Sequence, residues 1–338
     1  MDRTTYAVDI AKHVMQAHWV DAQTGEIGRR KLTRAKFLEF FAKVPAARVV
    51  MEACGGAHHW ARCLRGLGHE AQLLPARQVR AFVRGNKDDS ADARGLWLAS
   101  QHDDIRRVPV KSCEQQAILS LHRMREHWKS VRNQTINALR GLLYEFGVVL
   151  PKGRTSGLRA LAQQRADIDA RLAAPIARMV DAELIMLGEL DKRLQQLEAE
   201  INATSTPTAT KLRKVCGIGP LSASALAATL GDGTGWRSAR EFSASLGLVP
   251  AHNGTGGKIR MGHLTKRGDT YLRTLLMHGA RAVVAQAKNK PQWLQKLLLR
   301  RPVNVAVAAL ANKMARVAWA LVAHQRTYDP NWLSIKPQ

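Results

Sequence analysis

Hydrophobic and polar positions follow a short, strand-like period in the first part of the chain and a helical period from about residue 114 onward. Before that point, apolar runs rich in β-branched and aromatic residues predict strands at 4–10, 14–20, 48–52 and 71–74. The turn sequence AQTGEIG at 22–28 predicts a hairpin and a further strand directly after it. Helical spacing predicts helices at 35–43, 57–67 and 90–100, the last of them capped by Ser90.

This order of three strands followed by alternating helices and strands favours an α/β layer fold that begins with a meander. A doubly wound dinucleotide-binding fold is disfavoured, because no GxGxxG sequence follows the first predicted strand.

Two long helical stretches with heptad spacing come next and predict either an antiparallel arm or a dimerising coiled coil. The first apolar stripe consists of Leu121, Met124, Trp128, Val131, Thr135, Ala138 and Leu142. Basic side chains off this stripe form a flank available to nucleic acid: Arg123, Arg125, Lys129, Arg132 and Arg140. The second stripe consists of Leu187, Leu190, Leu194, Leu197 and Ile201. A Pro-Lys-Gly break at 151–153 separates the two stretches, and ATSTPTAT at 203–210 reads as a linker.

The last segment opens with a Gly-Ile-Gly turn, Gly217 to Gly219, before an alanine-rich helix. Such a turn looks like the hairpin of a helix-hairpin-helix element, whose glycines let backbone amides approach a DNA phosphate. An ordinary glycine-capped helix is the alternative. The apolar stretch 303–324 predicts a closing core helix.

Charge is distributed very unevenly along the chain. The protein carries 52 Lys and Arg against 27 Asp and Glu, a net charge of +25, and the residues from Thr206 onward hold 20 basic and four acidic side chains. This asymmetry favours a polyphosphate partner, since neutralised phosphates release condensed counterions. We expect a cytoplasmic protein with reduced thiols and no membrane partner, because its four cysteines form no CxxC pair and no signal peptide or membrane-length apolar run is evident.

Four acidic residues are placed to share one site. Asp9 and Glu52 each follow a predicted strand, while Asp89 and Asp92 are three residues apart at the start of a predicted helix and so share a face. Converging carboxylates in so cationic a protein are suited to one or two Mg²⁺ or Mn²⁺ ions, which assist phosphodiester transfer. Asp88 is an alternative ligand to Asp89, and Lys87 beside them is a candidate for contact with nucleic acid.

A glycine-rich segment near residue 255 combines a hydroxyl with many cations. Flexible backbone, Thr255 and nearby basic groups are what a scissile phosphate requires, and a mobile basic surface loop is the alternative. The candidate nucleic-acid contacts here are Gly256, Gly257, Lys258, Arg260, Lys266, Arg267 and Arg273, together with Gly217 and Gly219 upstream.

The motifs VDIAK, MEACGG, NKDDSADA, SLGLVPAHNGTGGK, LTKRGDTYLRTLLMHGAR and ALANKMARVAWAL together resemble the DEDD transposases of bacterial insertion sequences, relatives of the Piv DNA invertase. The resemblance covers nearly the whole chain. It implies an N-terminal RuvC-like domain of the RNase H type at 1–110, with Asp9, Glu52, Asp89 and Asp92 as its tetrad. It also implies a coiled-coil middle at 111–205 and a mostly helical C-terminal transposase domain at 206–338.

The same resemblance implies RNA-guided recombination of donor and target DNA by a dimer or tetramer whose protomers share catalytic parts. The sequence departs from the family pattern at one place, because the family's nucleophilic serine is missing and Thr255 is the only hydroxyl in HNGTGGK. Threonine is a competent but more hindered nucleophile. Ser243 and Ser245 lie nearby, in a stretch expected to hold small packing residues.

Three activities stay open at this point. A recombinase with a covalent protein–DNA intermediate at Thr255 is the leading hypothesis. A RuvC-type endonuclease acting on branched DNA would use the same carboxylates with water as the nucleophile. A catalytically dead scaffold that binds nucleic acid would use neither.

Overall fold

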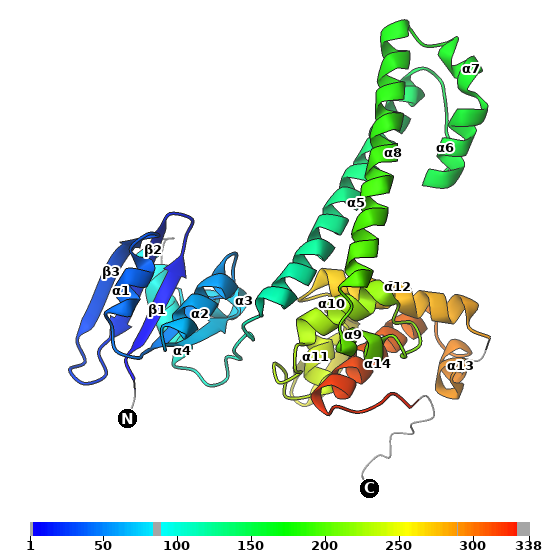
Figure 1. Ribbon diagram of the computed structural model, residues 1–338. Coiled ribbons are helices and arrows are strands. Elements are labelled where there is room, and N and C mark those ends of the chain that lie inside the picture. Colours follow the sequence, from blue (N-terminus) through cyan, green and yellow to red (C-terminus); the bar gives the residue numbers. More distant parts are fainter. Residues whose placement is uncertain (1–2, 84–88, 289, 330–338) are drawn as a thin grey trace. The chain divides into compact units, whose positions relative to one another are not determined.

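The computed structural model describes residues 3–83, 89–288 and 290–329, and it divides into two compact units, Met1–Gln115 and Gln116–Gln338 (Figure 1). A mixed α/β sheet makes up the first unit, and helices dominate the second.

A five-stranded sheet in the order β3-β2-β1-β4-β5 forms the first unit. Its strands are β1 (Thr5–Ile10), β2 (Val14–Val20), β3 (Ile27–Thr33), β4 (Arg48–Glu52) and β5 (Glu70–Leu74). The first three strands are antiparallel, whereas β4 runs parallel to both β1 and β5. These elements confirm the predicted strands, including the one expected after the turn.

Helices cover both faces of this sheet, and the alternation of side chains along each strand decides which face a residue serves. Val8 and Met51 pack with the aromatic residues of α1 (Phe37–Ala42) and with α2 (Ala57–Gly66). Ala7 and Val50 point the other way, toward the apolar face of α4 (Asp89–Ser100). On this second side the short helix α3 (Ala76–Val79) and the 3₁₀ turn η1 (Arg80–Phe82) precede α4.

Two long helices, α5 (Cys113–Glu145) and α8 (Ala174–Ala203), run side by side in the second unit (Figure 1) and carry α6 (Arg154–Gln163) and α7 (Arg165–Asp169) between them. We refer to these four helices as the arm. The stripe predicted for α8 is confirmed, because all five of its apolar members are buried.

The stripe predicted for α5 is wrong by about one position. Met124 is 43% exposed, whereas the buried residues of α5 are Ile118, His122, Ile136, Leu139 and Leu143. Between the two buried ends, the same three–four spacing runs through Arg125, Lys129 and Arg132, which were predicted to lie on a basic flank. Apolar periodicity could not locate this stripe, since its middle third is charged.

Ion pairs explain why cations occupy the middle of the α5 stripe. The guanidinium of Arg125 lies 2.6 Å from the Glu198 carboxylate, and that of Arg132 lies 2.9 Å from Asp191, both on α8. Arg154 of α6 also pairs with Asp191. These pairs fix the register of the two helices, and they assign Arg125 and Arg132 to the inside of the arm.

The C-terminal helices pack around one apolar core. They are α9 (Pro207–Leu212), α10 (Pro220–Leu230), α11 (Ala239–Ser245), α12 (Thr270–Gln286), α13 (Gln292–Leu298) and α14 (Val303–Ala323). The predicted linker at 203–210 is wrong, because α8 continues through Ala203 and α9 begins at Pro207. Thr206 caps α9 by accepting a hydrogen bond from the amide of Ala209.

The closing helix α14 confirms the prediction of a core element, but it corrects the expectation that no stretch has the length and apolar character of a membrane span. Within the described residues, α14 is the one helix that meets both criteria. More than half of its most apolar 18-residue stretch is buried inside the protein, where Ala311 and Ala315 are fully enclosed. The helix therefore serves the core of the second unit.

Candidate functional site

The first candidate site lies at one end of the sheet in the first unit. β1 and β4 are parallel neighbours with Val8 opposite Met51, so Asp9 and Glu52 follow at adjacent positions. Side-chain alternation directs both carboxylates to the face that α4 covers, together with Ala7 and Val50. Asp92 lies in the first turn of α4, which packs on that face, and the fold thus gathers three of the four predicted carboxylates.

The electrostatics of this site agree with its geometry. Burial and the charge of Asp92 raise the pKa of Glu52 above its usual value. Burial also raises the pKa of the Cys54 thiol, with further contributions from the charges of Glu52 and Asp9. Like charges held together in a partly desolvated place disfavour their own ionisation. The site is therefore under electrostatic stress that a bound cation would relieve.

Asp89 begins α4, but its side chain, like Lys87 and Asp88 as a whole, lies outside the described part of the chain. Among the side chains that are described, no three His, Cys, Asp or Glu residues form a ready metal-binding group. The donor chemistry nevertheless fits a hard divalent cation, because Asp9, Glu52 and Asp92 supply only carboxylate oxygens.

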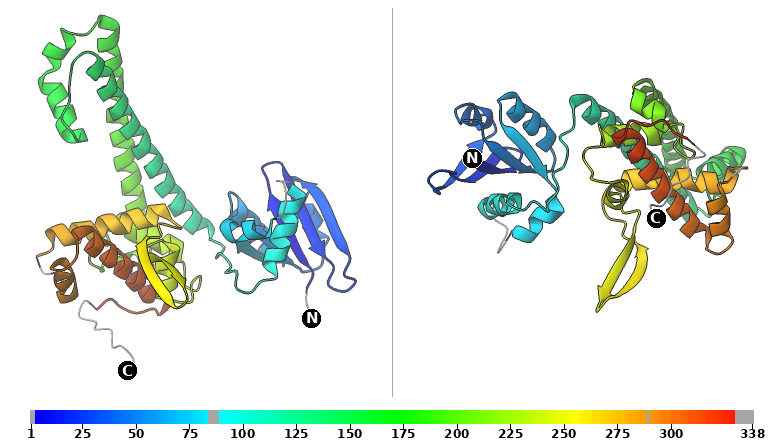
Figure 2. Two further views of the ribbon diagram at one scale, coloured as in Figure 1. Left: turned by 180° about the vertical axis from the view of Figure 1, so that it is seen from behind. Right: turned by 90° about the horizontal axis from the view of Figure 1, so that it is seen from below.

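The second candidate site is a β-hairpin, where a glycine-rich loop was expected. β6 (Pro250–Thr255) and β7 (Lys258–Leu264) pair antiparallel through a two-residue turn, Gly256-Gly257. Both glycines have a positive φ, 57° and 78°, which residues with a side chain rarely adopt. The hairpin extends away from the C-terminal helices (Figure 2).

The hairpin register groups a hydroxyl with two cations. Thr255 pairs with Lys258, and Asn253 pairs with Arg260. Directly paired residues share a face and alternate residues return to it, so Thr255, Lys258 and Arg260 lie on the same face. All three are exposed. This arrangement presents the candidate nucleophile with two positive charges beside it.

A tight turn after the hairpin carries the next two predicted contacts, Lys266 and Arg267, both exposed. Lys266 has a positive φ of 52°, and Gly268 packs so closely on the Ser245 carbonyl that a Cβ would lie 1.7 Å from its oxygen. Arg273 donates to the Leu246 carbonyl at 2.8 Å and to the Arg267 carbonyl at 3.1 Å. Arg273 therefore holds this turn in place.

The two serines considered as alternatives to Thr255 are committed to packing. Ser243 is 1% exposed, donates to the Arg240 carbonyl and accepts a hydrogen bond from Asn312. The Ser245 hydroxyl donates to the Phe242 carbonyl at 2.7 Å and accepts from the Trp236 indole. Their lower rank as nucleophiles agrees with these contacts.

The Gly-Ile-Gly turn joins α9 to α10, but its glycines differ in their surroundings. Gly217 has a φ of 89° and lies against Gly279 and Met314, so it serves close packing. Gly219 is exposed, with open space where a Cβ would be, and it precedes Pro220 at the start of α10. Of the two, Gly219 has the open backbone that contact with phosphate would need.

One polar cluster escaped the sequence analysis. His122 of α5 is 1% exposed, and its imidazole contacts the Tyr271 hydroxyl at 2.8 Å and the Ser224 hydroxyl at 3.2 Å. Burial and the nearby Arg125 lower the pKa of His122 to about 4, while burial raises that of Tyr271 to about 12. The cluster joins the arm to α10 and to the start of α12. The sequence signal that could have revealed this cluster is the position of His122, which lies four residues after Ile118 on the buried stripe of α5.

Comparison with known proteins adds to this geometry. A family described as transposase matches residues 6–147, and the transposase IS116/IS110/IS902 family matches residues 209–297. A probable family 20 transposase from Pseudomonas aeruginosa is 45% identical over 98% of this chain and the whole of its own length.

More distant relatives extend over nearly the same length. The transposase for insertion sequence element IS1111A of Coxiella burnetii is 35% identical over 95% of this chain and 90% of its own. The transposase for IS1328 of Yersinia enterocolitica is 33% identical over 96% and 98%. The chain thus belongs to the DEDD transposases of the IS110/IS116 family, and it is an enzyme that acts as a transposase.

Proposed function

We propose that this transposase cuts and rejoins DNA by metal-assisted phosphodiester transfer through a covalent protein–DNA intermediate. The observation that carries the proposal is the grouping of Asp9, Glu52 and Asp92 on the face of the sheet that α4 covers. So many carboxylates are costly to hold together in a partly buried place without a cation.

The first unit is, in this proposal, a RuvC-like catalytic domain of the RNase H type at 1–110. Its support is the strand order β3-β2-β1-β4-β5, with three antiparallel strands followed by two parallel ones. The rest divides into a coiled-coil region at 111–205 and a transposase domain at 206–338 with a helix-hairpin-helix-like element at α9–α10.

Asp9, Glu52, Asp89 and Asp92 would hold Mg²⁺ or Mn²⁺. When bound, the metal would supply Lewis-acid stabilisation of charge on the phosphoryl oxygens. The residues themselves would orient the ion: Asp9 and Glu52 from the strands β1 and β4, and Asp89 and Asp92 from the first turn of α4.

Thr255 is the proposed nucleophile. Its oxygen forms an ester bond with the scissile phosphorus while the bond from phosphorus to the leaving deoxyribose oxygen breaks. The threonine hydroxyl loses its proton, and the leaving oxygen gains one. Lys258 and Arg260, on the same face of the hairpin, offset negative charge that develops on the phosphoryl oxygens.

Donor and target DNA are the substrates in this proposal, and a non-coding guide RNA selects them by base pairing. The protein works as a homo-oligomer, a dimer or a tetramer, in the bacterial cytoplasm. The net charge of +25 supports polyanionic partners. Candidate phosphate contacts are Lys87, Gly217, Gly219, Gly256, Gly257, Lys258, Arg260, Lys266, Arg267 and Arg273.

The test uses purified protein with junction DNA of its element, the flanking non-coding RNA and Mg²⁺. We expect an adduct of protein and DNA that resists denaturation, formed by the wild type and absent in both Thr255→Ala and Asp9→Asn. Strand cleavage without an adduct, unchanged in Thr255→Ala, would instead establish a nuclease that uses water. Retained biological activity in Asp9→Asn would point to a scaffold.

A further inference from the structure

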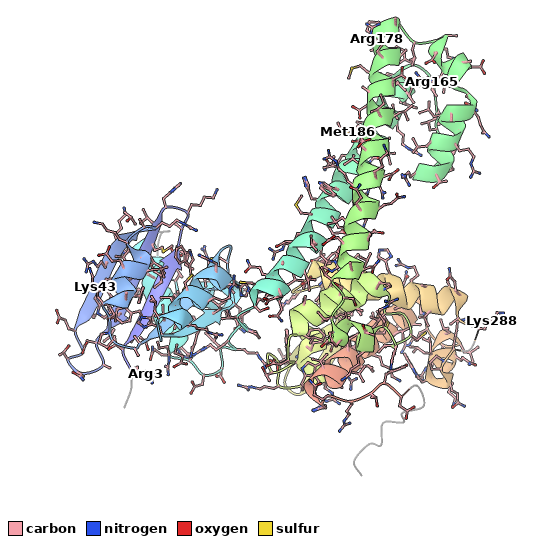
Figure 3. All side chains as sticks on the ribbon, viewed as in Figure 1. Arg3, Lys43, Arg165, Arg178, Met186 and Lys288 are labelled. Atoms are coloured by element: carbon pink, nitrogen blue, oxygen red, sulfur yellow. The ribbon has the colours of Figure 1, made fainter. Side chains whose placement is uncertain are left out.

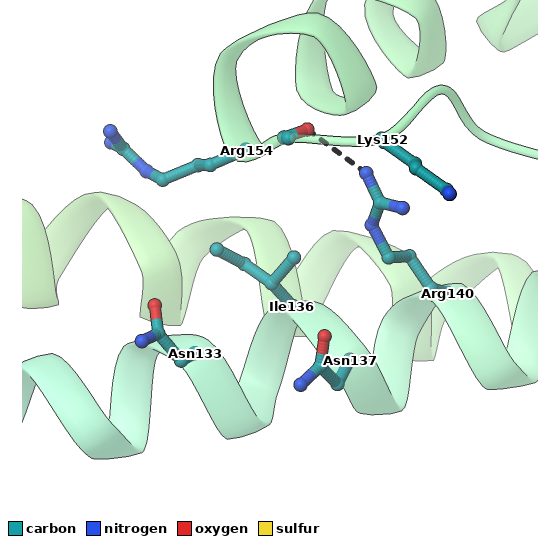
Figure 4. Close-up of a pocket in the computed structure, with 7 residues that line it drawn as sticks. Asn133, Ile136, Asn137, Arg140, Lys152 and Arg154 are labelled. Atoms are coloured by element: carbon teal, nitrogen blue, oxygen red, sulfur yellow. Dashed lines mark hydrogen bonds between the residues drawn. The ribbon is translucent and has the colours of Figure 1, made fainter. Parts of the chain in front are cut away.

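A small pocket of about 220 Å³, open to solvent, lies on the arm between α5 and the segment that leads into α6 (Figure 4). Asn133, Ile136, Asn137 and Arg140 line it from α5, and Lys152 and Arg154 line it from the other side. None of these residues belongs to the carboxylate site or the hairpin.

We propose that this arm pocket binds one unstacked nucleotide of a single-stranded nucleic acid. The base lies over Ile136 between the two asparagine amides, and the adjoining phosphate lies at Lys152 and Arg140. The inference rests on the proposed function in that it takes nucleic acid as the partner, and it adds a site away from the reacting groups.

The pocket has a cationic rim. Within the described part of the chain, neither Arg140 nor Lys152 forms an ion pair with a carboxylate, whereas Arg154 pairs with Asp191, a carboxylate that Arg132 shares. Arg140 is held in place because it donates to the carbonyls of Pro151 and Gly153. A fixed guanidinium with remaining N–H groups and an exposed lysine beside it are well suited to a phosphate.

The asparagines supply recognition of a base. Asn133 and Asn137 are four residues apart, so they share one face of α5, and Figure 4 shows both amides directed toward the segment above. Both are exposed and neither side chain has a hydrogen-bond partner among the described residues. Asparagine is a poor residue for a helix interior. A pair of free amides offers the donors and acceptors that match a base edge.

Size argues for a single base. At about 220 Å³ the cavity is smaller than the roughly 300–1,000 Å³ typical of sites that enclose a whole small molecule. A base inserted from a strand needs less room, because the rest of the strand is held outside by phosphate contacts. Unstacked bases are the usual targets of proteins that recognise single strands.

The experiment measures binding of fluorescent 12-residue single strands of RNA and of DNA, and of a duplex, to the full-length protein at several salt concentrations. In Lys152→Ala, we expect single-strand affinity to fall about fivefold and the slope of log K against log salt to fall by about 0.7, the value for one phosphate. In the double variant Asn133→Ala/Asn137→Ala, we expect a fall of about tenfold with no change in the salt slope. Duplex affinity should stay within twofold of the wild type.

Matched controls lie elsewhere on the arm. Arg178→Ala removes an exposed cation from α8 (Figure 3), and Gln134→Ala removes an exposed amide next to Asn133. Neither lines the pocket. Ultraviolet cross-linking of the bound strand to the wild type should map to 133–154. The RNA and DNA measurements identify which strand the pocket takes, because that strand is the one whose affinity falls in the pocket variants.

The outcomes separate the two proposals. If the wild type binds no single strand and forms no adduct, both fail. If it forms the adduct but the pocket variants bind single strands like the wild type, or lose no more affinity than Arg178→Ala and Gln134→Ala, only the pocket inference is overturned. Equal loss on duplex and single strands would also overturn it.

Discussion

The two candidate sites of this transposase are built in opposite ways. The carboxylates occupy a sheet whose neighbouring residues Ala7 and Val50 are completely buried, and a helix covers them. The hairpin with Thr255 has every residue of β6 exposed and is held mainly by its own backbone pairing. In the proposed function, the ligands of the metal need fixed positions, whereas the nucleophile must be reachable by a large DNA substrate.

This difference has an energetic consequence. At the carboxylate site, function opposes stability, since the raised pKa of Glu52 means that folding disfavours its charged form. At the hairpin, Lys258 and Arg260 are exposed, so their charges do not lower the stability of the fold through burial. Substitutions at the first site should therefore change both activity and stability, and those at the second should change activity alone.

The largest expected effect is the loss of activity in Asp9→Asn. An amide keeps the shape of the side chain but removes a charged ligand, so strand cleavage should fall roughly 10³-fold or more, about 4 kcal/mol in the barrier. Gel assays of cleaved junction DNA measure it. Glu39→Gln serves as the control, because Glu39 forms only an exposed ion pair with Lys43 in the same unit. Its strand cleavage should stay within twofold of the wild type. Equal activity in Asp9→Asn and the wild type would contradict the assignment.

The second prediction concerns the buried cluster that joins the arm to α10 and the start of α12. His122 has a folded pKa of about 4 against 6.5 for a free histidine, and Arg125, Tyr271 and Ser224 surround it. Because folding lowers the pKa of His122, the stability that depends on its neutral form is fully present above pH 6.5 and is lost as the pH drops toward 4. At pH 5 the loss should be about 2 kcal/mol.

Urea unfolding of the wild type and His122→Gln at pH 7.5 and pH 5 checks this sign. The variant should be less stable at pH 7.5, because it fits the Tyr271 and Ser224 hydroxyls less well, but it should lose less stability on acidification. His127→Gln, an exposed histidine on the same helix, should follow the wild type at both values. A parallel loss in all three proteins would assign the acid sensitivity to other groups.

Much of the first unit could be predicted from sequence, and less of the second. Residues such as Val8, Val49 and Met51 are apolar and β-rich in short runs, so hydrophobic pattern alone locates their strands. The α5 stripe could not be found this way, because Arg125 and Arg132 interrupt it and their partners lie far along the chain on α8.

The candidate sites show the same limit. Asp9 and Glu52 stand at strand ends, where position implies convergence, so their grouping was predictable. The hairpin at 250–264 was expected as a loop because glycines at 254, 256 and 257 obscure its strand pattern. The Asn133 and Asn137 pocket carries no motif, and it depends on the return of the chain at Lys152.

A smaller effect is expected for Thr255→Ser, which tests whether a serine hydroxyl can replace the threonine hydroxyl on the exposed hairpin. Serine lacks the methyl group that hinders threonine, so adduct formation should persist and become up to about tenfold faster. Quenched time courses of adduct formation measure the rate, with unchanged thermal stability as the sign that only the chemistry has changed. A loss of the adduct as complete as in Thr255→Ala would show that the hydroxyl does not act as the nucleophile.

The smallest effect is a shift in thermal stability, and it separates the two sites most directly. The folded pKa of Glu52 is raised, so its ionisation costs stability at neutral pH and the cost disappears as the pH falls below its unfolded value. Glu52→Gln should therefore raise the melting temperature at pH 7.5 by about 1–2 °C while abolishing strand cleavage. Glu26→Gln, which removes an exposed carboxylate from the same highly cationic protein, should give no such rise. Added Mg²⁺ should stabilise the wild type more than Glu52→Gln, because the variant keeps only three of the four proposed carboxylate ligands. A melting temperature that falls in Glu52→Gln without Mg²⁺ would mean that Glu52 stabilises the fold, and the contrast between the two sites would no longer hold.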